Sequence, residues 1–147
     1  MSRRRVLLCF VVTCAFVAFL RAQDSTSRSV WDGVYNDTQA NRGGSLYGEQ
    51  CARCHGASLT GGEDAPALVG GVFLSNWNGL TLGDLFDRVR VSMPADQPGR
   101  LRREQIADIL AYVLKANEFP TGSAELDYRV EYLKQIRFDA TKPEKQK

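Results

Sequence analysis

The stretch Cys51-Ala52-Arg53-Cys54-His55 decides how the rest of this 147-residue chain is interpreted. Two cysteines separated by two residues and followed at once by a histidine form the C-x-x-C-H pattern, to which c-type haem is attached. Two thiols about one helical turn apart can each bond a different vinyl group of the porphyrin. The next residue then lies beneath the ring, where its imidazole can ligate the iron. His55 is the only histidine in the sequence, so any proximal imidazole must be this one.

The first 22 residues have the layout of a signal peptide. Three arginines at positions 3–5 precede a 15-residue apolar run at positions 6–20, which only Thr13 interrupts, and a polar stretch follows Ala22. The run is short for a membrane span. We therefore expect residues 1–22 to be removed from a protein that is periplasmic or otherwise exported. The alternative is an uncleaved N-terminal anchor, which alone would attach the chain to a membrane.

Removal of residues 1–22 changes both the charge and the cysteine count. The chain has 19 basic and 17 acidic residues, and four of the arginines are lost, which leaves 15 against 17 and a net charge of −2. Such a balance does not favour nucleic-acid binding, which normally needs a strong basic excess. Cys51 and Cys54 remain as the only thiols. Alternatives for this pair are a disulfide, a redox pair or a zinc site, but a structural zinc ion needs four protein ligands and there is no second pair.

The second axial ligand is predicted at Met93. A thioether sulfur is a common partner of histidine in electron-transfer haem and raises the reduction potential. Met93 is the only methionine outside residues 1–22 and lies 38 residues after His55. Pro94 follows it, so an extended loop is expected there, because proline lacks an N–H and fixes its own φ. The alternative role for Met93 is to fill a gap in the core.

Apolar residues recur at helical spacing in three stretches, which predict an all-α fold. The first helix is expected at residues 39–55 and carries the motif at its end, where Gly56 stops it. The second begins after the N-cap Thr81 and ends before Met93. The third spans residues 102–116, with an apolar stripe at Ile106, Ile109, Leu110 and Val113.

The remaining segments have weaker patterns. Residues 56–80 are rich in glycine with little periodicity, so we expect a loop that packs against the cofactor without regular structure. Leu126, Val130, Leu133 and Ile136 predict an added amphipathic helix. Residues 141–147 are polar and are expected to fray.

At residues 41–117 the chain resembles the class I c-type cytochromes. The matching residues, in order, are Gly43, Tyr47, Cys51-Ala52-Arg53-Cys54-His55-Gly56, Pro66, Met93-Pro94, Ile109 and Tyr112. The resemblance implies a small cytochrome c-like helical fold wrapped around one covalently attached haem c with its iron. It also implies that Gly43 and Tyr47 cross closely over the helix of Ile109 and Tyr112. In that family the carbonyl of the loop proline accepts the proximal imidazole N–H, a role that would fall to Pro66.

A narrower likeness is to the cytochrome c modules of pyrroloquinoline-quinone (PQQ) dependent alcohol dehydrogenases. It rests on Phe73, Trp77, residues 81–86, residues 117–122 and residues 125–126. The predicted organisation is a signal peptide at 1–22, an N-terminal extension at 23–38, a cytochrome c domain at 39–126 and a C-terminal extension at 127–147.

The predicted function is that of an electron-transfer protein and not of an enzyme. His55 and Met93 together would fill both axial positions, so the iron would carry single electrons between redox partners, a dehydrogenase or an oxidase. One alternative is a cytochrome subunit of a periplasmic PQQ-type dehydrogenase complex. Another, from a different class, is a haem enzyme or gas sensor with an open iron position.

Two further features have a functional and a structural interpretation. Trp77 has two candidate roles: its indole N–H would hydrogen-bond a haem propionate or, alternatively, its ring simply packs against the porphyrin. Five arginines flank the Met93 loop and would offset propionate charge or dock an acidic partner, or else form a solvated surface. They are Arg88, Arg90, Arg100, Arg102 and Arg103.

Overall fold

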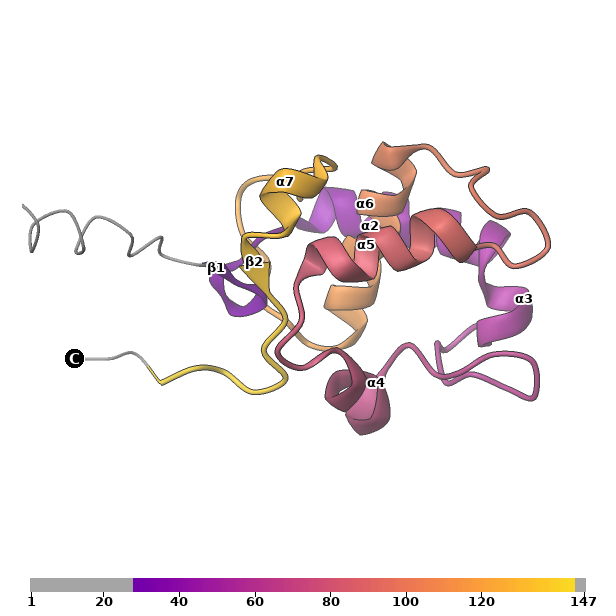
Figure 1. The fold of residues 1–147 in the computed structure, drawn as a ribbon, viewed down its shortest axis with the longest axis horizontal. Helices are drawn as coiled ribbons and strands as arrows, with labels where there is room; N and C mark the ends of the chain where they lie inside the picture. The colour runs from indigo at the N-terminus through magenta and orange to yellow at the C-terminus, as the bar shows by residue number, and fades with distance from the viewer. Residues whose placement is uncertain (1–27, 145–147) are drawn as a thin grey trace, which may run out of the picture.

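The computed structural model describes residues 28–144, which form a mostly helical fold (Figure 1). This confirms the all-α prediction. The elements in chain order are β1 (Arg28–Ser29), the 3-10 helix η1 (Val30–Asp32), α2 (Asp37–Gln50), α3 (Ala52–His55), α4 (Gly70–Trp77), α5 (Leu82–Ser92), α6 (Arg103–Ala116), α7 (Val130–Leu133) and β2 (Ile136–Arg137).

The core of the fold is the crossing of α2 and α6. Gly43 on α2 lies so close to the Asp108 carbonyl on α6 that a β-carbon at this position would overlap with it. One turn further on, the rings of Tyr47 and Tyr112 pack with their centroids 5.3 Å apart. The predicted contact of Gly43 and Tyr47 with the last long helix is therefore confirmed. The helices cross here because only glycine lets the two backbones approach this closely.

The predicted helix over residues 39–55 is present as two helices. It begins earlier, because the Asn36 side chain accepts a hydrogen bond from the Gln39 amide and caps α2. The chain then bends at Cys51, which has a non-helical φ of −126°, and α3 forms a single further turn. Gly56 ends that turn with a positive φ of 77°, as expected for a terminating glycine.

The second predicted helix is confirmed as α5, whereas the helix α4 is absent from the sequence-based prediction. Thr81 caps α5, with its side chain accepting from the Asp84 amide and Asp84 accepting in return from the Thr81 amide. The segment 56–80 was expected to lack regular structure, but residues 70–77 form α4. Phe73 on α4 is buried and contacts the core, which stabilises a helix that begins with two glycines.

The two ends of the described chain pack together. β1 pairs with β2 in parallel, and this small sheet lies at one end of the molecule while α3 lies at the other (Figure 1). The buried Tyr35 hydroxyl donates to the Phe119 carbonyl over 2.6 Å, and the Trp31 indole donates to the Asp139 carbonyl over 2.9 Å. Both extensions thus contribute buried residues to the common core.

The predicted C-terminal amphipathic helix is wrong in its extent. Only Val130–Leu133 is helical, and Ile136 belongs to β2. Leu126, Leu133 and Ile136 are nevertheless buried. The apolar stripe therefore marked core contacts correctly, but those contacts are made by a helical turn and an extended segment.

Two predictions concern residues outside the described part. The signal peptide at 1–22 and the first residues of the 23–38 extension lie there, as do the last three residues of the polar tail. Within residues 28–144, none of the helices has the length and apolar character that a membrane span requires.

Candidate haem site

A cavity of about 520 Å³ opens between the C-x-x-C-H motif and the Met93 loop. This volume lies within the ~300–1,000 Å³ typical of cofactor and ligand sites. The apolar part of the lining comes from every helix from α4 to α6 and from the loop before α4. These residues are Leu68, Phe73, Trp77, Leu85, Val89, Ile109, Leu110 and Val113. Much of the wall is therefore apolar, which suits a large flat apolar cofactor.

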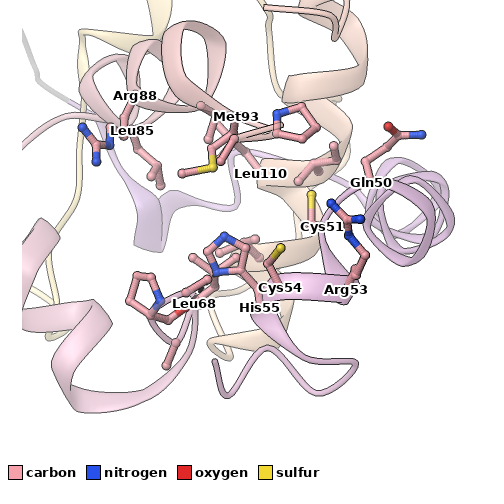
Figure 2. Close-up of a pocket in the computed structure, with 18 of the residues that line it drawn as sticks. Gln50, Cys51, Arg53, Cys54, His55, Leu68, Leu85, Arg88, Met93 and Leu110 are labelled. Atoms are coloured by element: carbon pink, nitrogen blue, oxygen red, sulfur yellow. Dashed lines mark hydrogen bonds between the residues drawn. The ribbon is translucent and has the colours of Figure 1, made fainter. Parts of the chain in front are cut away.

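His55 is oriented by a hydrogen bond on the side of its ring that faces away from the cavity. Its Nδ1 lies 2.8 Å from the Pro66 carbonyl oxygen. Because a carbonyl only accepts, Nδ1 carries the proton, and Nε2 is left with a lone pair. Figure 2 shows the ring directed into the open space of the cavity. The side chain is otherwise buried, with 8% of the residue exposed.

The Pro66 loop is held against His55 by its own close packing. Gly61 has a positive φ of 75°, and a β-carbon there would lie 2.5 Å from the Ala67 nitrogen. The Gly61 amide donates to the His55 carbonyl over 2.8 Å, and the Leu68 amide donates to the Leu59 carbonyl over 2.7 Å. Glycine at position 61 therefore lets the loop turn back and bring the Pro66 carbonyl to the imidazole.

Cys51 and Cys54 lie together on one side of the cavity (Figure 2), and both are free thiols. Cys51 is at the bend between α2 and α3, so its sulfur is directed into the cavity and not along the helix. Burial raises the pKa of the Cys51 thiol to about 11, and the nearby Cys54 adds a smaller effect in the same direction. The folded chain therefore keeps this sulfur as a neutral thiol at neutral pH.

Met93 lies on the opposite wall, where α5 ends. Its amide donates to the Val89 carbonyl over 2.9 Å as the C-cap of the helix, and its extended backbone then leads away into the loop. The side chain of Met93 points across the cavity toward the His55 imidazole (Figure 2). The helix ends before Met93, as the sequence predicts.

The predicted propionate partners are divided between the cavity and the surface. Trp77, Arg88 and Arg100 line the cavity. Figure 2 shows Arg88 at the side away from the two cysteines. Arg90 instead pairs with Asp87 over 3.0 Å, and the two arginines at the start of α6 are exposed.

Sequence reasoning missed one link across the mouth of the cavity. Arg53, between the two cysteines, forms an ion pair of 3.0 Å with Asp96 in the loop after Met93. The partners are 43 residues apart, and no local pattern connects them. The pair joins the motif to the loop of the opposite wall.

The donor set of the cavity fits a covalently attached haem. Two thiols lie on one side, an imidazole with a free Nε2 lies below, a thioether lies above, and the walls are apolar. Among the described residues, no group of three or more histidine, cysteine, aspartate or glutamate side chains is arranged to hold a metal ion directly. A helical fold with this cavity defines the class of the protein as a c-type cytochrome.

The comparisons with known proteins agree with this class. The family model described as cytochrome c oxidase, cbb3-type, subunit III matches residues 38–113, so this chain belongs to that family. A similar relative is the cbb3-type cytochrome c oxidase subunit CcoP of Azospirillum brasilense. It is 31% identical over 98 residues, which cover 56% of this chain and 32% of the relative. No solved structure matches the chain significantly.

Family membership gives the cofactor and the general role. The chain is an electron-transfer c-type cytochrome with covalently bound haem c and its iron. It spans about a third of the length of the Azospirillum relative, so the activity and partners of that whole protein do not transfer directly. The comparisons support a cytochrome c domain in general, and the narrower likeness to PQQ-dehydrogenase modules stays a prediction.

Proposed function

We propose that this chain is an exported monohaem electron carrier in which Cys51 and Cys54 hold the porphyrin by thioether bonds and His55 and Met93 ligate the iron. The observation that carries the proposal is the opposition of His55 and Met93 across one cavity with both cysteines on its wall (Figure 2). The haem supplies one-electron iron chemistry when it is bound. The sequence has a single C-x-x-C-H motif, which supports one haem.

The chain's own residues orient the ligands and keep out water. Pro66 accepts the Nδ1 proton of His55, which fixes the tautomer and raises the basicity of the ligating nitrogen. Met93 is presented by the end of α5, so its sulfur approaches from the opposite side. The apolar residues around the cavity lower the local dielectric, which adds to the control that the ligands exert on the reduction potential.

Arg88 and Trp77 support a further proposal for the propionate side of the cofactor. Both line the cavity, and Arg88 lies away from the cysteine wall (Figure 2). A haem attached through its vinyl groups directs its propionates to the opposite edge. Arg88 would then neutralise part of their charge, and the indole N–H of Trp77 would donate to them. The alternative, that Trp77 only packs on the ring, predicts no change in the propionate pKa on Trp77→Phe.

For the redox partner we favour a terminal oxidase over a dehydrogenase. Both the family description and the Azospirillum relative refer to subunits of a cbb3-type cytochrome c oxidase. A dehydrogenase complex is the alternative partner. Rapid oxidation of the reduced protein by an isolated oxidase would support the first, and co-purification with a larger dehydrogenase would support the second.

The alternative of an enzyme or gas sensor requires an open iron position. Met93 at the distal wall opposes it, because a bound thioether leaves no position for a substrate. Rapid CO binding to the ferrous protein or a five-coordinate resting spectrum would favour an open site.

The direct test is an optical spectrum followed by acid–acetone extraction of the full chain, produced in a host that attaches haem c. We expect a six-coordinate low-spin spectrum and a colour that stays with the protein. In Cys51→Ser with Cys54→Ser we expect little stable holoprotein. Normal yields of that double variant with haem retained would contradict covalent attachment through these sulfurs.

A further inference from the structure

Asn117 lies where α6 ends, and its side-chain amide reaches far along the chain. Nδ2 donates to the carbonyls of Val113 and Leu68, each over 2.9 Å, and Oδ1 accepts from the Gly70 amide over 3.1 Å. The bond to Val113 stays within the same helix. The other two join the end of α6 to residues 49 and 47 positions earlier in the sequence. Capping of α6 alone does not require them.

These two bonds hold the short connection between Pro66 and α4. This connection carries the Pro66 carbonyl, which accepts the hydrogen bond from His55 Nδ1. Leu68 is two residues after Pro66, whose carbonyl lies 2.8 Å from His55 Nδ1. Gly70 is the first residue of α4. Asn117 therefore fastens both sides of the connection, the Pro66 side and the α4 side, to the end of α6. Because α6 is itself held where it crosses α2 at Gly43, the connection is tied to a helix that is anchored in the core.

We propose that Asn117 is a positioning residue for the proximal ligand: by holding Leu68 and Gly70 it keeps the Pro66 carbonyl at His55 Nδ1. This inference rests on the proposed function, because it takes His55 as the iron ligand. A hydrogen bond from Nδ1 makes the ligating nitrogen more basic, and a more basic ligand favours the ferric state. Looser placement of Pro66 therefore shifts the reduction potential upward.

The size of the effect follows from the two bonds to Leu68 and Gly70, which an alanine would remove together with the bond to Val113. One neutral hydrogen bond contributes a net free energy that corresponds to roughly a fivefold to tenfold change in an equilibrium constant. Transient opening of the Pro66 loop should increase by at least this factor in the variant. The Nδ1 proton of His55 exchanges with solvent only when that hydrogen bond opens, so its exchange rate reports the change directly.

The experiment compares four full-length holoproteins: wild type, Asn117→Ala, Asn117→Asp and Gln39→Ala. Asn117→Asp keeps the size and the acceptor oxygen for Gly70 and removes the donor to Leu68. Gln39→Ala is the matched control. Gln39 is also a side-chain amide that bonds a distant backbone, at Leu126 N and O, but it does not touch the Pro66 loop.

The measurements are the exchange rate of the His55 Nδ1 proton, by NMR of the ferrous protein, and the reduction potential. We expect exchange about fivefold faster or more in both Asn117 variants, and a higher potential in Asn117→Ala, which changes no charge. Gln39→Ala should lower the free energy of unfolding and leave both readouts at the wild-type values. If Asn117→Ala does not fold, the exchange rate in Asn117→Asp gives the decisive comparison.

Two outcomes would overturn the proposal while leaving the axial ligands in place. One is an unchanged exchange rate and potential in an Asn117 variant that retains the six-coordinate spectrum. The other is an equal change in Gln39→Ala, which would show general loosening of the fold. A wild-type spectrum without histidine–methionine ligation would instead contradict the proposed function itself.

Discussion

The two walls of the haem cavity are built in different ways. The proximal wall, residues 55–68, is tied on several sides: His55 Nδ1 bonds Pro66, the His55 carbonyl accepts from Gly61, and the Gly56 carbonyl accepts from the Tyr47 hydroxyl over 2.6 Å. The distal wall, residues 91–101, presents Met93 from the end of α5, and Leu101 is the only one of these residues that is buried. The chain therefore holds the histidine more firmly than the methionine, and the distal ligand should be the first to be lost under stress.

The largest expected effect comes from a substitution that breaks the proximal wall. In Gly61→Ala the new β-carbon meets the Ala67 nitrogen at 2.5 Å, and the residue must keep a φ of 75°. A left-handed backbone alone costs about 1–2 kcal/mol for a residue other than glycine. With the backbone clash added, we expect a loss of roughly 2–4 kcal/mol in the free energy of unfolding, measured by urea denaturation.

Gly62→Ala is the control for this substitution. A β-carbon at position 62 has only the Cys54 carbonyl oxygen within 4 Å, at 3.7 Å, which is an ordinary contact. We expect its stability to stay within about 0.5 kcal/mol of wild type. Equal losses in the two variants would show that the Pro66 loop is not specifically braced by Gly61.

A smaller effect is expected when the tie between α2 and the proximal wall is removed. Tyr47→Phe deletes the hydroxyl that donates to Gly56 and should cost about 1 kcal/mol at neutral pH. Tyr132→Phe, at a residue that is 50% exposed, should cost almost nothing. Urea denaturation of both variants measures the difference, and a loss that is no larger in Tyr47→Phe would contradict the tie.

The same tyrosine predicts how stability depends on alkaline pH. Burial raises the pKa of Tyr47 to about 12, above the ordinary 10. Between these values the unfolded chain loses the proton while the folded chain keeps it, so the stabilisation present below pH 10 is lost as pH rises toward 12. Tyr47→Phe should therefore lose less stability over this range than wild type. Burial also raises the pKa of Tyr35 to about 12. Tyr35 therefore still contributes to the alkaline pH dependence in the Tyr47→Phe variant.

The smallest expected effect lies on the distal wall. Arg53 and Asp96 are exposed, and such ion pairs contribute roughly 0.2–1 kcal/mol. Arg53→Gln should make Met93 easier to displace by added imidazole, by up to about fivefold at low salt. The difference should disappear at high salt, because exposed charges are then screened.

Asp96→Asn tests the same pair from the other side. It should match Arg53→Gln, and the double variant should show no further change. A difference between wild type and Arg53→Gln that persists at high salt would exclude an electrostatic link between the motif and the Met93 loop.

Sequence patterns were informative where neighbouring residues determine the structure. Thr81 is the predicted N-cap of α5, and in the structure it forms a capping box with Asp84, three residues further on. The motif and Gly56 likewise mark the end of α3. Gly43 and Tyr47, together with the resemblance to class I cytochromes, indicated the crossing of α2 and α6.

The features that were missed depend on contacts between distant residues. Helix α4 begins with Gly70 and Gly71, which have low helix propensity, and only the spacing of Phe73 and Trp77 signals it. The pairing of β1 with β2 joins segments of two residues each, which are too short for any periodicity. The bonds of Asn117 and the ion pair of Arg53 span more than 40 residues, so they become visible only in the folded chain.

The most direct measurement is the far-red absorption of the ferric protein before and after Met93→Ala. Wild type should show the sulfur-to-iron charge-transfer band, and the variant should lose it together with a lower reduction potential, while the haem stays attached through Cys51 and Cys54. A band that persists unchanged in Met93→Ala would contradict the assignment of His55 and Met93 as the two ligands that face each other across this cavity.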